Sequence, residues 1–380
     1  MKALIVDAVR TPRGKARPDG GLAQETPHGL VARLVQAIDD RGGSPRDVDQ
    51  LILGCVGQVG AQGGHIGMVA KFAAGLTDRT VTHTLNNFCA SGLSAIGNAA
   101  AAIEAGQVDR ALAGGVEMMS RVGFMADGAD YYTAEEFEPR LRYIPVALAA
   151  DLLAVKLGIT REQLDSVALE SQRRSALAEE VPALLASRIT IGALDREEAV
   201  RPSTAERFAK LPPAFAELAK AYTGPLEGQA IEHRHTVAHA PPMADGAGLA
   251  LLASSGSARA RILAYAETGG DPRDSLLAGF DAIDRALSTV GLGLPDMDRI
   301  EFMEAFAVVA AHFLKSRPVD PAKVNVSGGH LAKGHPMGAT GAILTSTLLD
   351  ALDESGGRLG LVVATGAQGV GAAMVVERLA

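Results

Sequence analysis

The chain has 380 residues, 47% of them hydrophobic, and a formal net charge of −8. This length predicts two or three packed units rather than one ordinary core. The negative charge argues against nucleic acid or an anionic membrane as a partner. Two cysteines without framework spacing, and no apolar run long enough to span a bilayer, lead us to expect a cytoplasmic protein without membrane insertion.

Short apolar runs alternate with longer Ala- and Leu-rich segments, and this alternation predicts an α/β protein. The expected strands are 3–9, 50–54, 80–85, 110–114, 260–267, 323–326 and 360–365. The expected helices are 29–39, 91–105, 273–290 and 341–352. Between about 117 and 239, β-like runs are rare, and the segments 145–157 and 161–179 predict a helical insertion, while 202–213 has the pattern of an irregular connection.

Cys89 lies where an expected strand gives way to an expected helix, in the segment 86–92 (NNFCASG). Exposed backbone N–H groups and the positive end of the helix dipole at such a position favour the nucleophilic thiolate. The alternative is a buried, inert cysteine that packs as a small hydrophobe. This segment alone leaves both interpretations open.

His335 lies between glycines in the segment 334–341 (GHPMGATG), which permits a tight turn and a close approach of a ligand. A histidine held in this way could take the proton from Cys89. The alternative is a structural turn with incidental histidines. The segment 301–307 (EFMEAFA) by its pattern alone indicates no more than the start of a helix.

These segments together resemble the thiolase family over nearly the whole chain. The segments that carry the resemblance, in chain order, are 8–15 (AVRTPRGK), the Cys89 segment, 114–120 (GGVEMMS), 201–215 and the His335 segment. The chain is most similar to the acetyl-CoA acyltransferases of fatty-acid β-oxidation. The resemblance implies two similar α/β halves packed as a five-layer αβαβα core, with a helical loop domain inserted in the first half. The implied boundaries are 1–116 plus 240–258 for the first half, 117–239 for the loop domain and 259–380 for the second half.

The resemblance also implies roles for individual residues. Cys89 would accept the acyl group, and His335 would activate Cys89 and help to bind the thioester oxygen. Ala305 and Phe306 would line the tunnel for the pantetheine of CoA, and Lys210, with Arg201 and Arg207 as further basic residues, would lie near its phosphates. No metal or covalently bound cofactor is implied, because CoA and acyl-CoA thioesters are substrates. The implied partners are a second copy, as a homodimer or homotetramer, and hydratase or dehydrogenase enzymes.

Three positions depart from the family pattern. Met303 stands where the family has an asparagine or histidine that holds a water, and Pro241 stands where it has a serine that touches the pantetheine. Thr365 replaces the second catalytic cysteine, and the loss of a general base typically costs roughly 10²–10⁴-fold in rate. His330 could substitute as a base, but we favour its interpretation as a solvated loop residue.

Three functions therefore remain in competition. The first, which we favour, is thiolysis of a 3-ketoacyl-CoA or the reverse Claisen condensation through an acyl thioester on Cys89. In the second, the acyl group passes from Cys89 to water, an amine or a carrier-bound acceptor. In the third, the chain is a non-catalytic acyl-CoA-binding subunit of a multienzyme complex, because a fold does not fix a function.

Overall fold

The strands of the described part of the chain form one mixed sheet, in the order β4-β3-β5-β6-β1-β7-β10-β9-β8, with β2 beside β6. The computed structural model describes residues 3–133, 136–138 and 141–379. The strands of the first half are β1 (Leu4–Arg10), β2 (Gly14–Lys15), β3 (Gln50–Gly54), β4 (Val81–Leu85), β5 (Arg110–Met118) and β6 (Ala244–Ala253). Those of the second half are β7 (Ala260–Gly269), β8 (Arg299–Phe302), β9 (Leu359–Gly366) and β10 (Val370–Arg378).

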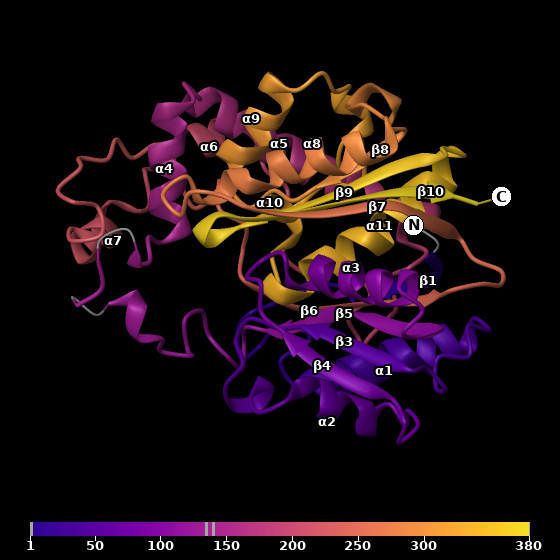
Figure 1. Cartoon of the computed structure of the whole chain (residues 1–380). Helices are drawn as coiled ribbons and strands as arrows, with labels where there is room; N and C mark the ends of the chain where they lie inside the picture. Colours follow the sequence, from indigo (N-terminus) through magenta and orange to yellow (C-terminus); the bar gives the residue numbers. More distant parts are fainter. Residues whose placement is uncertain (1–2, 134–135, 139–140, 380) are drawn as a thin grey trace.

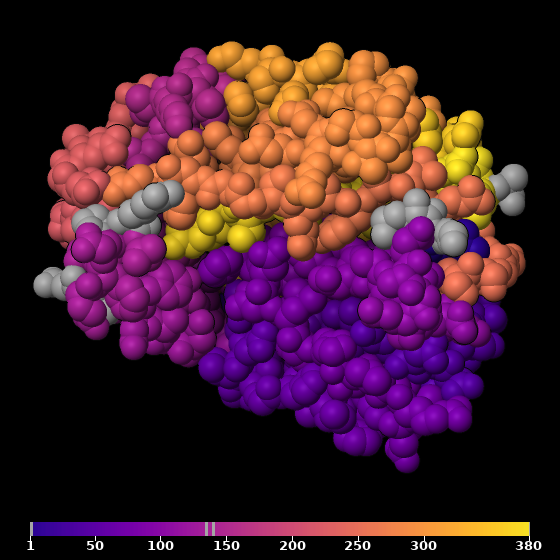
Figure 2. Space-filling view, viewed as in Figure 1, coloured from indigo at the N-terminus to yellow at the C-terminus, as the bar shows by residue number. Residues whose placement is uncertain are grey.

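A short ladder joins the two halves of this sheet. In the described part of the chain, β1 pairs with β7 only at Leu4–Arg261 and Ile5–Ala260, whereas β1 pairs with β6, and β7 with β10, over most of their lengths. The two halves therefore turn toward each other and enclose a layer of helices (Figure 1). In the space-filling view the first half forms the lower part of the visible surface and the second half the upper part (Figure 2).

The layers follow from which helix packs on which strand. The central layer consists of α3 (Ser91–Glu104), which packs on β3 and β5, and α11 (Thr340–Ser355), which packs on β6 and β9. One outer layer holds α1 (Pro27–Asp40) and α2 (Ile66–Ala73); the other holds α8 (Ala278–Val290), α9 (Ala307–Ser316) and α5 (Arg161–Ala178) (Figure 1). The expected five-layer αβαβα architecture is confirmed.

Small residues let the central helices lie close to their neighbours. A Cβ on Gly97 of α3 would lie 2.1 Å from the ring of Tyr265 on β7, and a Cβ on Gly341 of α11 would lie 2.3 Å from the backbone nitrogen of Leu93 on α3. Such contacts are too short for any side chain, so glycine is required at both positions. The scarcity of large aromatic residues in the sequence matches this thin central layer.

Most of the expected elements are confirmed, with four differences. The strand expected at 323–326 is wrong, since the structure has only an isolated bridge between Val324 and Ile300 there. The helix expected from 273 begins at Ala278, after a 3₁₀ turn at Ser275–Leu277. The connection expected at 202–213 contains α6 (Ala205–Ala209), and the segment 301–307 spans the end of β8 and the start of α9.

Between β5 and β6 the described residues contain helices and turns but no strand of the sheet. These helices are α4 (Val146–Lys156), α5, α6 and α7 (Ala216–Ala219). α5 packs against α9 and α10 (His330–Lys333) of the second half. The domain limits at 117 and 239 stay a prediction. No helix in the described ranges combines the length and the apolar character needed to cross a membrane.

Candidate active site

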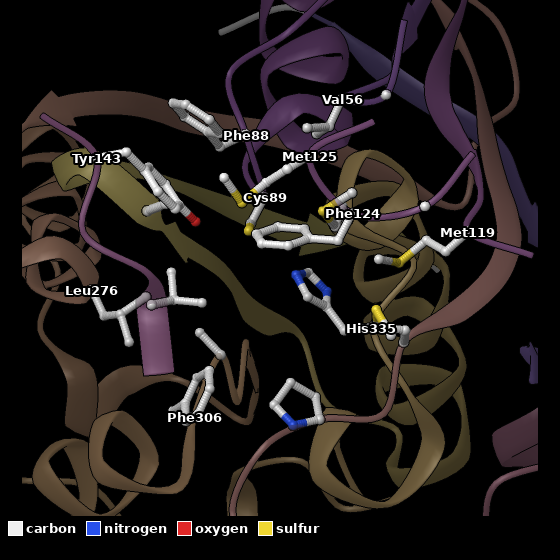
Figure 3. Close-up of a pocket in the computed structure, with 18 of the residues that line it drawn as sticks. Val56, Phe88, Cys89, Met119, Phe124, Met125, Tyr143, Leu276, Phe306 and His335 are labelled. Atoms are coloured by element: carbon white, nitrogen blue, oxygen red, sulfur yellow. The ribbon is translucent and has the colours of Figure 1, made fainter. Parts of the chain in front are cut away.

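A cavity of about 270 Å³ lies at the junction of the two halves, and both Cys89 and His335 line it (Figure 3). Ala305 and Phe306 line the same cavity, so the structure brings together four of the residues singled out from the sequence. The remaining wall is mostly apolar and includes Val56, Phe88, Met119, Phe124, Met125, Val146, Phe215, Leu276 and Met337.

A tight turn between β4 and α3 presents Cys89 to this cavity. Phe88 adopts a φ of 44°, a left-handed conformation that is uncommon for a bulky residue. Ser91 secures the turn, because its hydroxyl donates to the carbonyl of Phe88 (2.6 Å) and accepts from the N–H of Asn87 (2.8 Å). Backbone strain of this kind persists where the surrounding contacts enforce it, and it is common at functional sites.

The cavity keeps the Cys89 thiol protonated. Burial raises the pKa of Cys89 to about 12, although the backbone N–H groups of Ala367 and of Cys89 itself favour the thiolate. Without its substrate, Cys89 is therefore a neutral thiol near pH 7. The same N–H groups would favour negative charge on an atom bound beside the sulfur.

A loop after α10 holds His335 in place. Its backbone N–H donates to the carbonyl of Pro242 (2.8 Å), and its Nδ1 shares a hydrogen bond with the hydroxyl of Thr340 (2.7 Å). Its Nε2 has no hydrogen-bond partner among the described residues, so this nitrogen is available to a group in the cavity. Burial and the nearby charge of Arg13 lower the pKa of His335 to about 3, which keeps the imidazole neutral.

The three departures from the family pattern differ in their relation to the cavity. The hydroxyl of Thr365 donates to the carbonyl of Leu276 (2.6 Å), and Thr365 is not among the residues that line the cavity. Met303 is fully buried and also lies away from the lining, whereas Pro241 belongs to it. The Thr365 hydroxyl is thus committed to a backbone contact and is no base for a substrate.

His330 is not solvated, so the sequence interpretation is wrong. The residue is 0% exposed, and its ring packs edge-on against the ring of His335, with 5.5 Å between the centroids. Neither of its ring nitrogens has a hydrogen-bond partner in the described ranges, and burial lowers its pKa well below the ordinary value. His330 therefore supports His335 as a neutral packing partner. His330 lies four residues before Gly334 of the histidine motif, and the sequence around it does not indicate that its side chain is buried.

The basic residues expected near CoA phosphates lie apart from the cavity lining. Lys210 is exposed at the end of α6, and Arg201 and Arg207 are exposed nearby in the insertion. Their role stays a prediction.

Sequence reasoning missed the aromatic residues that cover Cys89. Tyr143 and Tyr132 line the cavity from the insertion, and their rings pack against each other and against Tyr131. Four of the five tyrosines of the chain lie within 117–239, and this enrichment was the available signal.

A cysteine and a histidine that face one cavity, with backbone donors at the sulfur, define a site for nucleophilic acyl transfer. Comparison with known families agrees with this class. The thiolase N-terminal domain matches residues 3–256, and the thiolase C-terminal domain matches residues 257–378. The chain belongs to the thiolase family of acyl-CoA acyltransferases.

Relatives named as thiolases match this chain over nearly their whole lengths. A steroid 3-ketoacyl-CoA thiolase of Mycobacterium tuberculosis is 34% identical over 401 residues, covering 100% of this chain and 94% of the relative. A beta-ketoadipyl-CoA thiolase of Acinetobacter baylyi is 35% identical over 414 residues, covering 99% of each. A 3-oxoadipyl-CoA/3-oxo-5,6-dehydrosuberyl-CoA thiolase of Escherichia coli is 34% identical over 416 residues, covering 100% of each.

The raised pKa of Cys89 predicts how the free protein reacts with iodoacetamide. Because only the thiolate is alkylated, the rate at Cys89 should rise about tenfold per pH unit between pH 7 and pH 10, with no plateau in that range. Mass spectrometry of the peptide that contains Cys89 would measure this rate.

Cys55 is the internal control. It is fully buried, and burial with the nearby carboxylate of Glu117 raises its pKa further, so it should stay unmodified while the fold is intact. A rate at Cys89 that is already constant above pH 7 would show instead that the free protein holds a stable thiolate.

Proposed function

We propose that the chain catalyses thiolysis of a 3-ketoacyl-CoA by CoA, and the reverse Claisen condensation, through an acyl thioester on Cys89. The observation that carries this proposal is that Cys89 and His335 line the same mostly apolar cavity, and that Nε2 of His335 has no hydrogen-bond partner among the described residues. The names of the three relatives support the reaction class, because each is a thiolase of a 3-ketoacyl- or 3-oxoacyl-CoA.

In the acylation step, Nε2 of His335 takes the proton of Cys89 while the sulfur attacks the 3-keto carbon. The N–H groups of Ala367 and Cys89 then stabilise the developing oxyanion. The raised pKa of the Cys89 thiol and the lowered pKa of His335 disfavour a thiolate–imidazolium pair before the substrate binds. Proton transfer is therefore coupled to attack, when the substrate carbonyl takes up the negative charge.

CoA and its thioesters are the substrates of this proposal. The pantetheine arm would pass along Ala305 and Phe306, and the phosphates would lie near Lys210, with Arg201 and Arg207 as further cations. The segment 117–239, as the loop domain, would cover the pantetheine arm and the phosphates. We propose further that the protein is cytoplasmic and that it associates with hydratase or dehydrogenase enzymes.

Substitution at the two residues tests the mechanism. Cys89→Ser should abolish the acyl adduct seen by intact mass and reduce cleavage of acetoacetyl-CoA in the presence of CoA to background. His335→Asn should lower kcat by roughly 10²–10⁴-fold, because the proton acceptor is lost. Loss of absorbance of the 3-ketoacyl thioester would measure the rate.

Cys55→Ser serves as the matched control, since Cys55 is a buried thiol outside the cavity lining and should leave kcat nearly unchanged. Adduct formation on Cys89 without thiolysis would replace the proposal by acyl transfer to water or another acceptor. Absence of any adduct would leave only an acyl-CoA-binding role.

The lining also indicates which acyl groups fit. Asp127 is the one ionisable carboxyl group of the lining, and no lysine or arginine occurs among the described residues that form it. A carboxylate at the end of the acyl chain would find no cation there and would be repelled by Asp127. We therefore expect an uncharged acyl chain, in contrast to the substrates named for the adipyl-type relatives.

Paired kinetics would check this selectivity. kcat/KM for 3-ketohexanoyl-CoA should exceed that for 3-oxoadipyl-CoA by at least about tenfold, corresponding to about 1.4 kcal/mol. Asp127→Asn should lower the ratio of the two kcat/KM values, because it should raise kcat/KM for 3-oxoadipyl-CoA and leave that for 3-ketohexanoyl-CoA unchanged. Equal kcat/KM values in the unmodified protein would contradict the expectation.

We also propose a homodimer, or a homotetramer built from it, through the β4 edge of the sheet. Among the described residues β4 pairs only with β3, which leaves its other edge unpaired there. Apolar side chains are exposed beside this edge: Val81 (55%), Phe72 (64%), Val69 (45%) and Met68 (38%). An exposed edge strand with apolar neighbours is a ready surface for pairing with another chain.

Phe72→Glu should shift the mass measured by light scattering from a dimer or tetramer toward the monomer, because it places a charge in the proposed contact. Leu177→Glu on α5 is the control, since Leu177 is similarly exposed (54%) but lies far along the chain on another layer. An unchanged mass for Phe72→Glu, or a monomer in the unmodified protein, would reject this surface.

A further inference from the structure

The hydroxyl of Tyr143 faces Cys89 inside the cavity. Tyr143 is 2% exposed and lines the cavity, and Figure 3 shows its hydroxyl pointing toward the Cys89 side chain. A negative charge on Cys89 would raise the pKa of the phenol. A buried hydroxyl that is directed at a nucleophile is in a position to exchange a proton with a bound substrate.

Packing fixes the direction of the Tyr143 ring. Its backbone N–H donates to the carbonyl of Tyr131 (3.2 Å), and its ring meets the rings of Tyr132 and Tyr131 edge-on at 5.2 and 6.2 Å. The hydroxyl of Tyr143 nevertheless has no hydrogen-bond partner among the described residues. The surrounding rings thus orient the hydroxyl, but none of the described residues forms a hydrogen bond with it.

The other hydroxyl groups near Cys89 are occupied. Tyr132, the second hydroxyl of the lining, donates to the carboxylate of Asp127 (3.0 Å). Thr365 donates to the carbonyl of Leu276 and lies outside the lining. Of the described hydroxyl groups that line the cavity, that of Tyr143 is the one without a hydrogen-bond partner, and it can act as a second acid and base beside His335.

We propose that Tyr143 is a catalytic residue of the reaction proposed above: it gives a proton to the carbanion formed when the C2–C3 bond breaks, and it takes a proton from the incoming CoA thiol. This role rests on the proposed function. Because Tyr143 belongs to the insertion, the insertion would supply the acid and base that Thr365 cannot provide.

The protons and electrons balance over one cycle. Cys89 gives its proton to His335 and attacks the 3-keto carbon, and the electron pair of the broken C2–C3 bond remains on C2. The Tyr143 hydroxyl protonates C2, which completes acetyl-CoA and leaves a phenolate. The phenolate takes the proton of CoA, the CoA thiolate attacks the acyl thioester, and Cys89 leaves and recovers its proton from His335.

The order of basicities favours both transfers. Burial raises the pKa of Tyr143, so the phenol is protonated before the reaction, as an acid must be. A carbanion beside a thioester is a much stronger base than a phenolate. The phenolate is in turn a stronger base than a thiolate, since ordinary pKa values are about 10 for tyrosine and about 8.5 for a thiol.

Tyr143→Phe tests the role, because it removes the hydroxyl and keeps the ring in its packing. Cleavage of acetoacetyl-CoA should fall by roughly 10²–10⁴-fold. In D₂O, incorporation of deuterium into the methyl group of acetyl-CoA, measured by mass spectrometry, should be lost. Acylation of Cys89 by acetyl-CoA should fall much less, because a CoA thiolate can leave without an acid, whereas a carbanion cannot.

Tyr131→Phe is the matched control, since Tyr131 belongs to the same ring cluster but does not line the cavity, and it should retain cleavage and exchange. Retained exchange in Tyr143→Phe would overturn the role, and so would equal losses of cleavage and acylation, which indicate a merely structural residue. If the unmodified protein forms no adduct on Cys89, the proposed function itself fails, and the role of Tyr143 fails with it.

Discussion

The buried carboxylate of Glu117 connects the segments that form the candidate site. It accepts hydrogen bonds from the N–H groups of Val56 (2.9 Å), Gly57 (3.0 Å) and Gly338 (3.0 Å), and from the side-chain amide of Gln62 (2.7 Å). Gly338 lies three residues after His335, and Val56 lines the cavity. One carboxylate in β5 thereby fixes the His335 loop of the second half against the first half.

This arrangement depends on complete pairing of the carboxylate. Burial raises the pKa of Glu117 even though four donors favour its charged form. Removing a donor would leave an acceptor unpaired in a dry interior, at a typical cost of about 1–3 kcal/mol. A Cβ on Gly338 would lie 2.9 Å from the carboxylate oxygen, so a glycine is needed for the contact. The glycine of the histidine motif therefore has a structural reason beyond the turn itself.

A second group of buried charged side chains lies near His335. Arg10 contacts Glu197 at 2.6 Å and Arg13 contacts it at 3.5 Å, and despite burial these cations lower the pKa of Glu197 to about 2. Burial lowers the pKa of Lys333 and raises that of Glu301. The charge of Arg13 also disfavours protonation of His335. The first strand and the insertion thus act on the electrostatics of the site without entering its cavity.

Patterns of adjacent residues predict those features of the structure that depend on neighbours in the sequence. The turn at Cys89 and the glycines around His335 are read from adjacent residues, and the alternation of elements predicts the layers. The commitment of Thr365 to the carbonyl of Leu276, 89 positions away, cannot be read in this way. Nor can the burial of His330 or the orientation of Tyr143, because packing between distant elements decides both. The motifs identified the nucleophile Cys89 and its partner His335. The groups that shift the pKa values of these two residues come from other parts of the chain.

The electrostatics of Cys89 and His335 have a consequence for specificity. With the pKa of Cys89 raised to about 12 and that of His335 lowered to about 3, the free pair is neutral. A neutral thiol is a poor nucleophile and is oxidised slowly, so the resting site is protected. Reactivity requires a ligand whose carbonyl can accept charge beside the N–H groups of Ala367 and Cys89. A thioester or ketone whose oxygen is held at that point therefore promotes attack by Cys89, because the N–H groups stabilise the charge that develops on the oxygen.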